Sequence, residues 1–308
     1  MLSFFASRLL ATGVVLFGVT VLVFALIHLI PGDPVEIMLG ESARAADREA
    51  LRAALGLDRP LWVQLGDYLA GLARGDLGQS LHYRQPIMEI LLERLPATVE
   101  LAAAALLVAV VIAFPLGALA AMYRDSIWDR LAMGFSLAGV SIPNFWMGPL
   151  LILVFSLWLG WFPVSGREGP ASLVLPALTL GTALAAILAR MLRSALLEVL
   201  SEDYIRTARA KGLADREVLW RHALRNAALP VITVLGLQLG TLLGGAVITE
   251  TVFSWPGVGL LTLEAIQQRD YPLVQACVLL ISFAYVAVNT ATDVVYAWVD
   301  PRIRLGEG

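Results

Sequence analysis

Residues 201–230 read SEDYIRTARAKGLADREVLWRHALRNAALP, a stretch with many charged side chains in an otherwise apolar chain. It lies between two apolar stretches, near 173–193 and 229–252, and each of these is long enough to cross a bilayer as a helix of about 20 residues. The charged stretch is therefore expected to form an internal loop of a membrane protein.

The pattern within this loop predicts two capped helices. Ser201 is suited to the N-cap of a first helix and Asp215 to that of a second, while Gly212 is the residue type that ends a helix in the left-handed conformation. The second helix would place its apolar residues largely apart from its arginines, with Leu219, Trp220, Ala223 and Leu224 on one side and Arg216, Arg221 and Arg225 away from it. The arginines could simply anchor the cytoplasmic side, but anchoring does not require capped helices. We therefore favour a rigid knob that docks into a groove of a partner protein.

The composition of the whole chain indicates an all-α integral membrane protein. Of its 308 residues, 58% are hydrophobic and only 15% are charged, and the mean hydropathy is +0.77. In soluble domains about a quarter of the residues are charged, so this composition is typical of a protein embedded in a bilayer. Six transmembrane helices are predicted near 9–30, 97–122, 131–159, 173–193, 229–252 and 273–298. The first apolar run is too long for a cleaved signal peptide and is expected to be a retained span.

The basic residues of the short loops predict the orientation. An N-terminus in the cytoplasm satisfies the positive-inside rule, because it places inside Arg8, Arg124, Arg130, Arg190, Arg193, the cations of 206–225, Arg302 and Arg304. Only Arg167 and Arg269 then lie in short outer loops. We predict one transmembrane domain over 1–308 with both termini inside, a helical extracytoplasmic loop at 31–96 and a cytoplasmic loop at 194–228. The outer loop either covers the ends of the spans or docks a soluble partner.

No set of residues in the sequence predicts catalysis, so the chain is not expected to be an enzyme. The three histidines, His28, His82 and His222, lie in separate parts of the chain, and neither HExxH nor the phosphate-binding pattern GxxxxGK[ST] occurs. Any nucleotide chemistry would therefore belong to another chain. We predict no catalytic, cofactor-binding or metal-binding residue, and no nucleic-acid partner.

An ion-coupled secondary transporter is the alternative from a different class. Its candidate residues are Glu100, Glu250 and Asp293, the ionisable groups within the predicted spans. All three fall near the ends of those spans, whereas the coupling sites of secondary transporters usually lie near the midplane. Hydrogen bonding at helix ends is therefore the favoured role for these carboxylates.

Residues 201–230 resemble the EAA loop of ABC-importer permeases, in particular the B-type subunit of the dipeptide/oligopeptide/nickel family. The general pattern is EAA, three residues, Gly, nine residues, then I-x-L-P. Here Gly212 and Ala208 match, while Arg206 and Thr207 replace the glutamate and the first alanine. Only the leucine of I-x-L-P matches, at 222–225, but YIRTARAKG followed by HALRNAALP is itself typical of this subgroup.

Further motifs extend the resemblance over essentially the whole chain and in the family's order. They are LIPGDP (29–34), LGLDRPL (55–61), GDLGQS (75–80), SIPNFW (141–146), ETVFSWPGVG (250–259), RDYPLVQ (269–275) and DPRIR (300–304).

The resemblance implies a six-helix permease with the type I ABC-importer fold. It also implies a heterodimer with a second, homologous permease subunit, two cytoplasmic ABC ATPase subunits and an extracytoplasmic substrate-binding protein that delivers ligand. ATP and Mg would act in the ATPase subunits, and this chain would hold no cofactor. The cytoplasmic loop would be the coupling helix, and its expected ATPase contacts are Asp203, Arg206, Thr207, Ala208, Lys211, Gly212 and Leu213. Gly212 would set the turn, and Arg206 and Lys211 would pair with acidic residues of the ATPase groove.

The same resemblance implies transport of di- and oligopeptides across a bacterial or archaeal cytoplasmic membrane, within which the chain contacts lipid. Glutathione and nickel are the alternatives within the family. The form SEDYIRTARAKG favours peptides or glutathione, whereas SIPNFW together with PATVEL is closer to the nickel type. The sequence does not assign the residues that line the substrate path.

Overall fold

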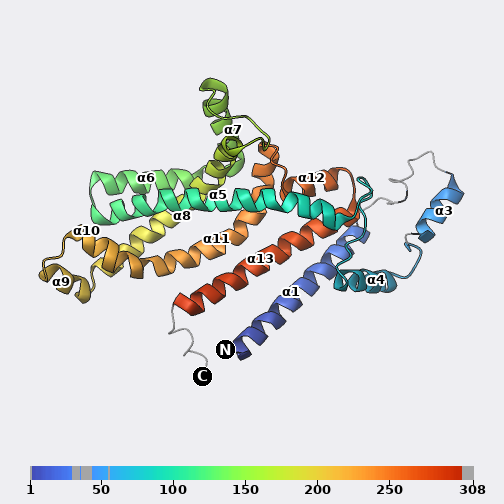
Figure 1. Ribbon diagram of the computed structural model, residues 1–308, viewed down its shortest axis with the longest axis horizontal. Coiled ribbons are helices and arrows are strands. Elements are labelled where there is room, and N and C mark those ends of the chain that lie inside the picture. Colours follow the sequence, from blue (N-terminus) through green and yellow to red (C-terminus); the bar gives the residue numbers. More distant parts are fainter. Residues whose placement is uncertain (1, 30–34, 36–43, 55, 300–308) are drawn as a thin grey trace. The chain divides into compact units, whose positions relative to one another are not determined.

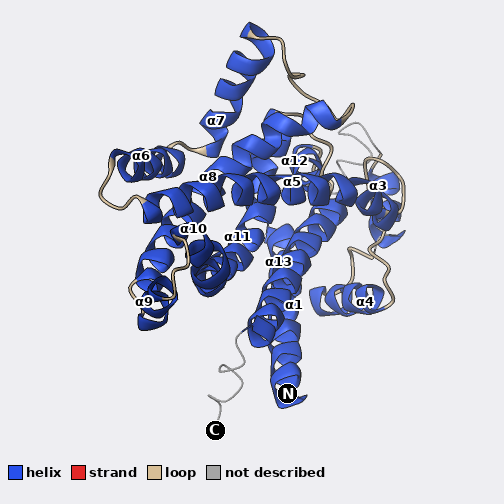
Figure 2. Ribbon diagram, turned by 60° about the vertical axis from the view of Figure 1, so that its left-hand side comes forward, coloured by secondary structure: helices blue, strands red, loops and turns tan. Residues whose placement is uncertain are grey.

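Helices form most of the computed structural model, which describes residues 2–29, 35, 44–54 and 56–299 (Figure 1). Over these residues it contains helices, turns and loops but no strand (Figure 2). The motif at 300–304 and all of the motif at 29–34 except Leu29 lie outside the described residues, as do Arg302 and Arg304. Asp293 is described only as part of a helical backbone.

The chain divides into two compact units. Unit 1 comprises residues 1–97 and 256–286, and unit 2 comprises residues 98–255 and 287–308.

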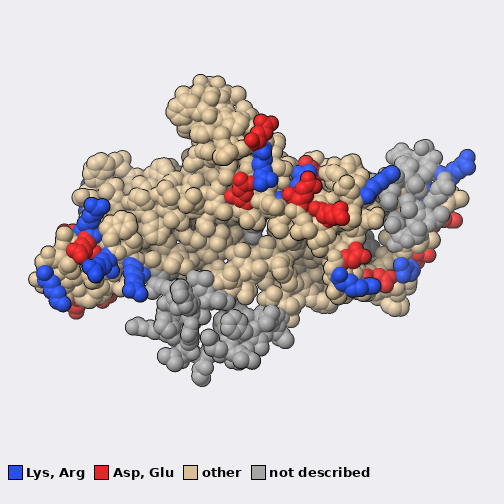
Figure 3. Space-filling view, viewed as in Figure 1, with Lys and Arg blue, Asp and Glu red and all other residues tan. Residues whose placement is uncertain are grey.

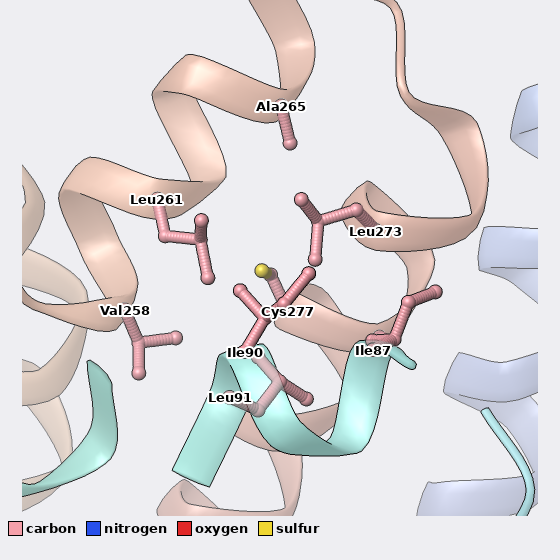
Figure 4. Packing of buried hydrophobic residues seen from close by; sticks show 9 residues of the cluster. Ile87, Ile90, Leu91, Val258, Leu261, Ala265, Leu273 and Cys277 are labelled. Atoms are coloured by element: carbon pink, nitrogen blue, oxygen red, sulfur yellow. The ribbon is translucent and has the colours of Figure 1, made fainter. Parts of the chain in front are cut away.

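Unit 1 has a core of buried apolar side chains. Its helices are α1 (Leu2–Leu29), α3 (Ala45–Ala54), α4 (Leu61–Ala73), the first residues of α5 (Ile87–Met122), α12 (Val258–Gln267) and most of α13 (Tyr271–Val299). The core joins the start of α5 to α12 and α13 (Figure 4), and it contains Ile87, Ile90, Leu91, Val258, Leu261, Ala265, Leu273, Ala276 and Cys277.

This core explains one departure from the sequence pattern. Residues 86–95 have the pattern of a separate short amphipathic helix, but they run without a break into α5. Because Ile87, Ile90 and Leu91 are buried against α12 and α13, the amphipathic face is satisfied in place and the helix continues toward Met122.

Unit 2 is built around α8. In chain order it contains the remainder of α5, α6 (Ile127–Ser141), α7 (Asn144–Leu151), the π-helix η1 (Ile152–Trp158), α8 (Pro170–Leu200), α9 (Asp203–Ala210), α10 (Asp215–Glu217), the π-helix η2 (Val218–Ala223), α11 (Leu224–Val252) and the end of α13. Helix α8 contacts α6, α7, α11 and η2. Its leucines Leu188, Leu192 and Leu196 are fully buried, so this helix is the interior element of the unit.

The stretch 131–159, predicted as one span, consists of two helical pieces. Helix α6 and the segment Asn144–Trp158 meet at an angle of 105°. Pro143 lies at the break, and Ile142 before it has extended backbone angles because proline disfavours the helical conformation of the preceding residue. The span predicted over 131–159 is therefore interrupted by a complete break at Pro143.

Three described helices are long and apolar enough to cross a membrane, namely Ile87–Met122, Pro170–Leu200 and Tyr271–Thr292. Two bent pairs raise this number to five if each pair is one span. One is the pair around Pro143, and the other runs from Asp215 to Gly240 with a bend of 49°. The arrangement of six spans with both termini inside stays a prediction.

Candidate functional site

The first helix of the cytoplasmic loop, α9, begins at Asp203, with Glu202 at its N-cap in an extended conformation. The prediction that Ser201 caps this helix is wrong. Helix α8 continues to Leu200, and the Ser201 hydroxyl donates to the carbonyl of Glu198 at 2.7 Å. The serine therefore completes the end of α8, which leaves α9 without a side-chain cap.

The turn after α9 depends on Gly212. Its φ angle is +83°, which confirms the predicted left-handed conformation. The Gly212 N–H donates to the Arg209 carbonyl at 2.9 Å, and the Leu213 N–H donates to the Ala208 carbonyl at 3.4 Å. These bonds satisfy carbonyl groups at the end of α9 and send the chain back toward a second helical segment.

That second segment starts at Asp215, with Ala214 rather than Asp215 at the N-cap. The Asp215 carboxylate instead accepts from the Arg209 guanidinium at 3.0 Å. Because this ion pair crosses the Gly212 turn, it joins the end of α9 to the start of α10. The predicted cap residue thus contributes to the same turn through a different bond.

The two helical segments share a small apolar core. Ile205 and Ala208 of α9 are buried, as are Val218, Leu219 and Ala223 of η2, and α9 contacts η2. The helix pair is therefore packed on its own apolar face, as the sequence predicts.

Trp220 departs from the predicted apolar side, because its side chain is 57% exposed. Residues 218–223 are π-helical, so each residue turns less about the axis than in an α-helix. This brings Leu219 and Ala223 close to one line on the buried face and leaves Trp220 outside it.

Most of the predicted ATPase contacts lie on the exposed face of the loop. Asp203, Arg206, Thr207, Lys211 and Gly212 are exposed, and Leu213 is half-buried. Ala208 differs, because it is only 7% exposed and belongs to the apolar core of the loop. Its position supports packing of α9 rather than a direct contact with a partner.

The charged side chains of this loop form only exposed ion pairs. Arg206 contacts Asp203 at 3.2 Å and Arg221 contacts Glu217 at 3.3 Å, both within one helical turn. Exposed pairs of this kind contribute little to stability. Figure 3 shows charged atoms gathered over the part of unit 2 that carries α9 and α10, next to a broad surface without charge. The loop thus offers charged groups that its own fold does not require.

Sequence reasoning missed one polar contact at the base of the loop. The Asn226 amide donates to the Tyr204 hydroxyl at 2.7 Å and so ties α9 to the start of α11. The two residues are 22 positions apart, and neither lies in a pattern that would pair them.

Two of the three carboxylates considered for ion coupling, Glu100 and Glu250, have partners in unit 2. The Thr98 hydroxyl donates to buried Glu250 at 2.7 Å, and Arg167 forms an ion pair with Glu100 at 2.7 Å. The position of Glu250 near the end of α11 fits hydrogen bonding at a helix end, whereas Glu100 lies inside α5 because this helix already begins at Ile87. Among the described residues, no group of three or more His, Cys, Asp or Glu is placed to hold a metal ion.

Comparison with known proteins covers nearly the full chain. Residues 113–305 match the family described as "Binding-protein-dependent transport system inner membrane component", and residues 1–102 match the N-terminal part of such components. The chain is 48% identical over 335 aligned positions to the di/tripeptide transport system permease protein DppB of Pseudomonas aeruginosa, and 99% of each chain is covered. It is 44% identical over 304 positions to the glutathione transport system permease protein GsiC of Escherichia coli strain CFT073, again with 99% of each covered.

Solved structures show the same fold at low sequence identity. A chain of the MetNI methionine ABC transporter has a TM-score of 0.60 at 20% identity, and the match covers 70% of this chain and 99% of that one. A chain of an amino acid ABC transporter has a TM-score of 0.51 at 14% identity. That match covers 70% of this chain and 94% of the transporter chain. The resemblance drawn from residues 201–230 is confirmed: the chain belongs to the family of binding-protein-dependent transport system inner membrane components, within the group of dipeptide-type ABC-importer permeases.

Proposed function

We propose that this chain is the permease subunit of an ATP-driven importer that moves di- and oligopeptides across the bacterial cytoplasmic membrane, with six spans and both termini in the cytoplasm. The observation that carries the proposal is the helix pair of residues 203–223. It is packed on one face by its own apolar residues and exposes charged residues on the other.

Two cytoplasmic ATPase subunits are the proposed partners of this exposed face. The chain has no phosphate-binding loop, so ATP and Mg would bind in those subunits. The proposed contacts are Asp203, Arg206, Thr207, Lys211, Gly212 and Leu213, and Arg206 and Lys211 would pair with acidic groove residues. ATP-driven closure of the ATPases would then pull the loop and swing the attached helices between inward-facing and outward-facing states.

A second, homologous permease subunit and an extracytoplasmic substrate-binding protein complete the proposed assembly. The family description supports the binding protein directly, since members are components of binding-protein-dependent systems. The second permease would enclose the substrate path together with this chain.

Di- and tripeptides are the favoured substrates, because the relatives at 46–48% identity are named as dipeptide or di/tripeptide permeases. Glutathione is the second candidate, and one observation favours it. The alignments with the dipeptide permeases run over 335 and 336 positions, more than the 308 residues of this chain, so those relatives carry residues that this chain lacks. The alignment with the glutathione permease runs over 304 positions, which fits a chain of nearly the same length.

Reconstitution of the whole assembly in liposomes tests the proposal. We expect uptake of labelled dialanine that requires the binding protein and ATP on the cytoplasmic side, and that stops when the ATPase carries a substitution of its catalytic glutamate. Labelled glutathione in the same vesicles separates the two substrates. Uptake by this chain alone, driven by a proton or sodium gradient without ATP, would show that it is an ion-coupled transporter instead.

A further inference from the structure

A half-buried ion pair joins α6 to α8 in unit 2. Asp129 is 4% exposed, and its two carboxylate oxygens accept from Nε and Nη2 of Arg193 at 2.6 and 2.7 Å. This two-bond geometry fixes the orientation of both side chains as well as their distance. It differs from the exposed ion pairs of the cytoplasmic loop, whose partners are held by single contacts.

The same carboxylate also holds the turn between α5 and α6. The Asp125 N–H donates to Asp129 at 3.0 Å, and the Asp129 N–H donates to the hydroxyl of Ser126, the N-cap of α6. Arg130 donates to the Asp125 carbonyl at 3.3 Å. One side chain, Asp129, therefore connects the α5–α6 turn, the start of α6 and the side of α8.

Helix α8 carries this connection toward the cytoplasmic loop. From Arg193 it continues as regular helix to Leu200, which is about 10 Å of helix at 1.5 Å per residue. Only Ser201 and Glu202 separate its end from α9, and the Ser201 hydroxyl extends the end of α8. Buried Ala195 and Leu196 pack this segment within the unit. A displacement of α9 thus reaches Arg193 through a short and stiff connection.

We propose that the Asp129–Arg193 pair is a positioning element of the transport cycle, which makes α6, the α5–α6 turn and the end of α8 follow the coupling loop as one body. The proposal rests on the proposed function, in which ATPase subunits pull on α9. Neither residue touches the ATPase or the substrate in this scheme. The pair converts a pull on the loop into movement of the adjoining spans.

The test variant is Asp129→Asn in the full complex with its ATPase subunits and binding protein. It removes the charge that holds Arg193 but keeps the side-chain shape and the exposed face of α9. We expect normal co-purification of the ATPase subunits and continued ATP hydrolysis, with the number of peptides transported per ATP reduced about tenfold, within the usual range of coupling between sites.

Asp125→Asn is the matched control. It lies four residues away, removes the exposed carboxylate that pairs with Arg124 at 3.3 Å, and leaves in place the backbone bonds of Asp125 to Asp129 and Arg130. Asp125 has a φ angle of +63°, which asparagine also accepts. We expect the ratio of transport to ATP hydrolysis in this variant to equal that of the wild type.

The ratio is measured only in monodisperse, fully assembled complexes, so a general loss of folding does not imitate the effect. If Asp129→Asn does not assemble, Arg193→Lys supplies the test, because it keeps the charge and loses the two-bond geometry. A wild-type ratio in either assembled variant overturns the proposal, and a reduced ratio supports it. Failure of the proposed function would appear separately, as transport by the wild-type complex that does not depend on ATP.

Discussion

Polar side chains are used in opposite ways in two regions of the molecule. The first is the helix pair of residues 203–223 in unit 2, and the second is the contact between residues 80–83 and 270–273 in unit 1. In the first region, the carboxylates of Asp203 and Asp215 lie at the surface and pair with exposed arginines. The buried residues there are apolar.

In the second region, a buried carboxylate is the common acceptor of several hydrogen bonds. Asp270 is fully buried, and it accepts from the Ser80 hydroxyl, from the His82 N–H at 3.1 Å and from the Leu273 N–H at 3.3 Å. The Tyr83 N–H donates to the Ser80 hydroxyl oxygen at 2.9 Å. This polar contact joins segments 190 positions apart in the chain.

The comparison separates charges that hold the fold from charges that are available to a partner. A buried carboxylate with three donors cannot be removed without leaving those donors unsatisfied. An exposed ion pair can be removed at little cost to folding, so the charges of the loop are available for contact with a partner. Substitutions in the two regions should therefore differ in what they change.

The largest effect on stability is expected for Asp270→Ala. Loss of the common acceptor leaves the buried Ser80 hydroxyl and Leu273 N–H and the partly buried His82 N–H without their partner, and we expect the free energy of unfolding to fall by about 3 kcal/mol. Thermal unfolding of the purified chain in detergent measures this change.

Asp67→Ala is the control for that experiment, because Asp67 is a carboxylate of the same unit that is 60% exposed and pairs with Arg59 at 2.8 Å. We expect a loss below about 1 kcal/mol. Equal losses in the two variants would show that burial of the carboxylate does not distinguish the two regions.

An intermediate effect is expected for Gly212→Val. A Cβ atom at this position meets no atom within 4 Å, so the substitution introduces no clash. The strain lies in the backbone, since a left-handed conformation costs an L-residue about 1–2 kcal/mol and a β-branched residue more. We expect the Gly212 turn to be lost, with weaker co-purification of the ATPase subunits and reduced transport.

Gly212→Asn is the matched variant, because asparagine is the side chain that enters the left-handed region most readily. We expect it to retain most transport. If valine and asparagine reduce transport equally, the conformation of the backbone is not what the loop requires at Gly212.

Some local features of the loop could be predicted from the sequence, namely those that the residue type alone determines. Gly212 is the example: its left-handed conformation follows from the absence of a Cβ atom. The buried Leu219 and Ala223 follow from helical periodicity. The exposure of Trp220 does not follow from this periodicity. A π-helical turn has no clear signature in the sequence, and it changes which residues face solvent.

The long-range contacts could not be predicted, because each depends on residues brought together only by the fold. The Ser80–Asp270 contact joins two motifs that the sequence shows separately, and nothing in either indicates the other. The Asp129–Arg193 pair spans 64 positions, and in the sequence Arg193 counts only as one of many basic residues on the inner side. Ser201 is a related case, because its role depends on how far α8 extends.

The smallest effect on stability is expected for Arg206→Ala in the cytoplasmic loop. The Arg206 side chain is 74% exposed and contacts only Asp203 among the ion pairs described, so the loss of unfolding free energy should stay below about 1 kcal/mol. Arg221 offers a matched control, because it is 75% exposed and forms a similar pair with Glu217 at 3.3 Å. We expect Arg206→Ala, and not Arg221→Ala, to weaken binding of the ATPase subunits, measured as the salt concentration at which they dissociate from the immobilised permease. If the two variants are equally sensitive to salt, both arginines contribute only through a general electrostatic attraction. The specific contact proposed for Arg206 would then be wrong.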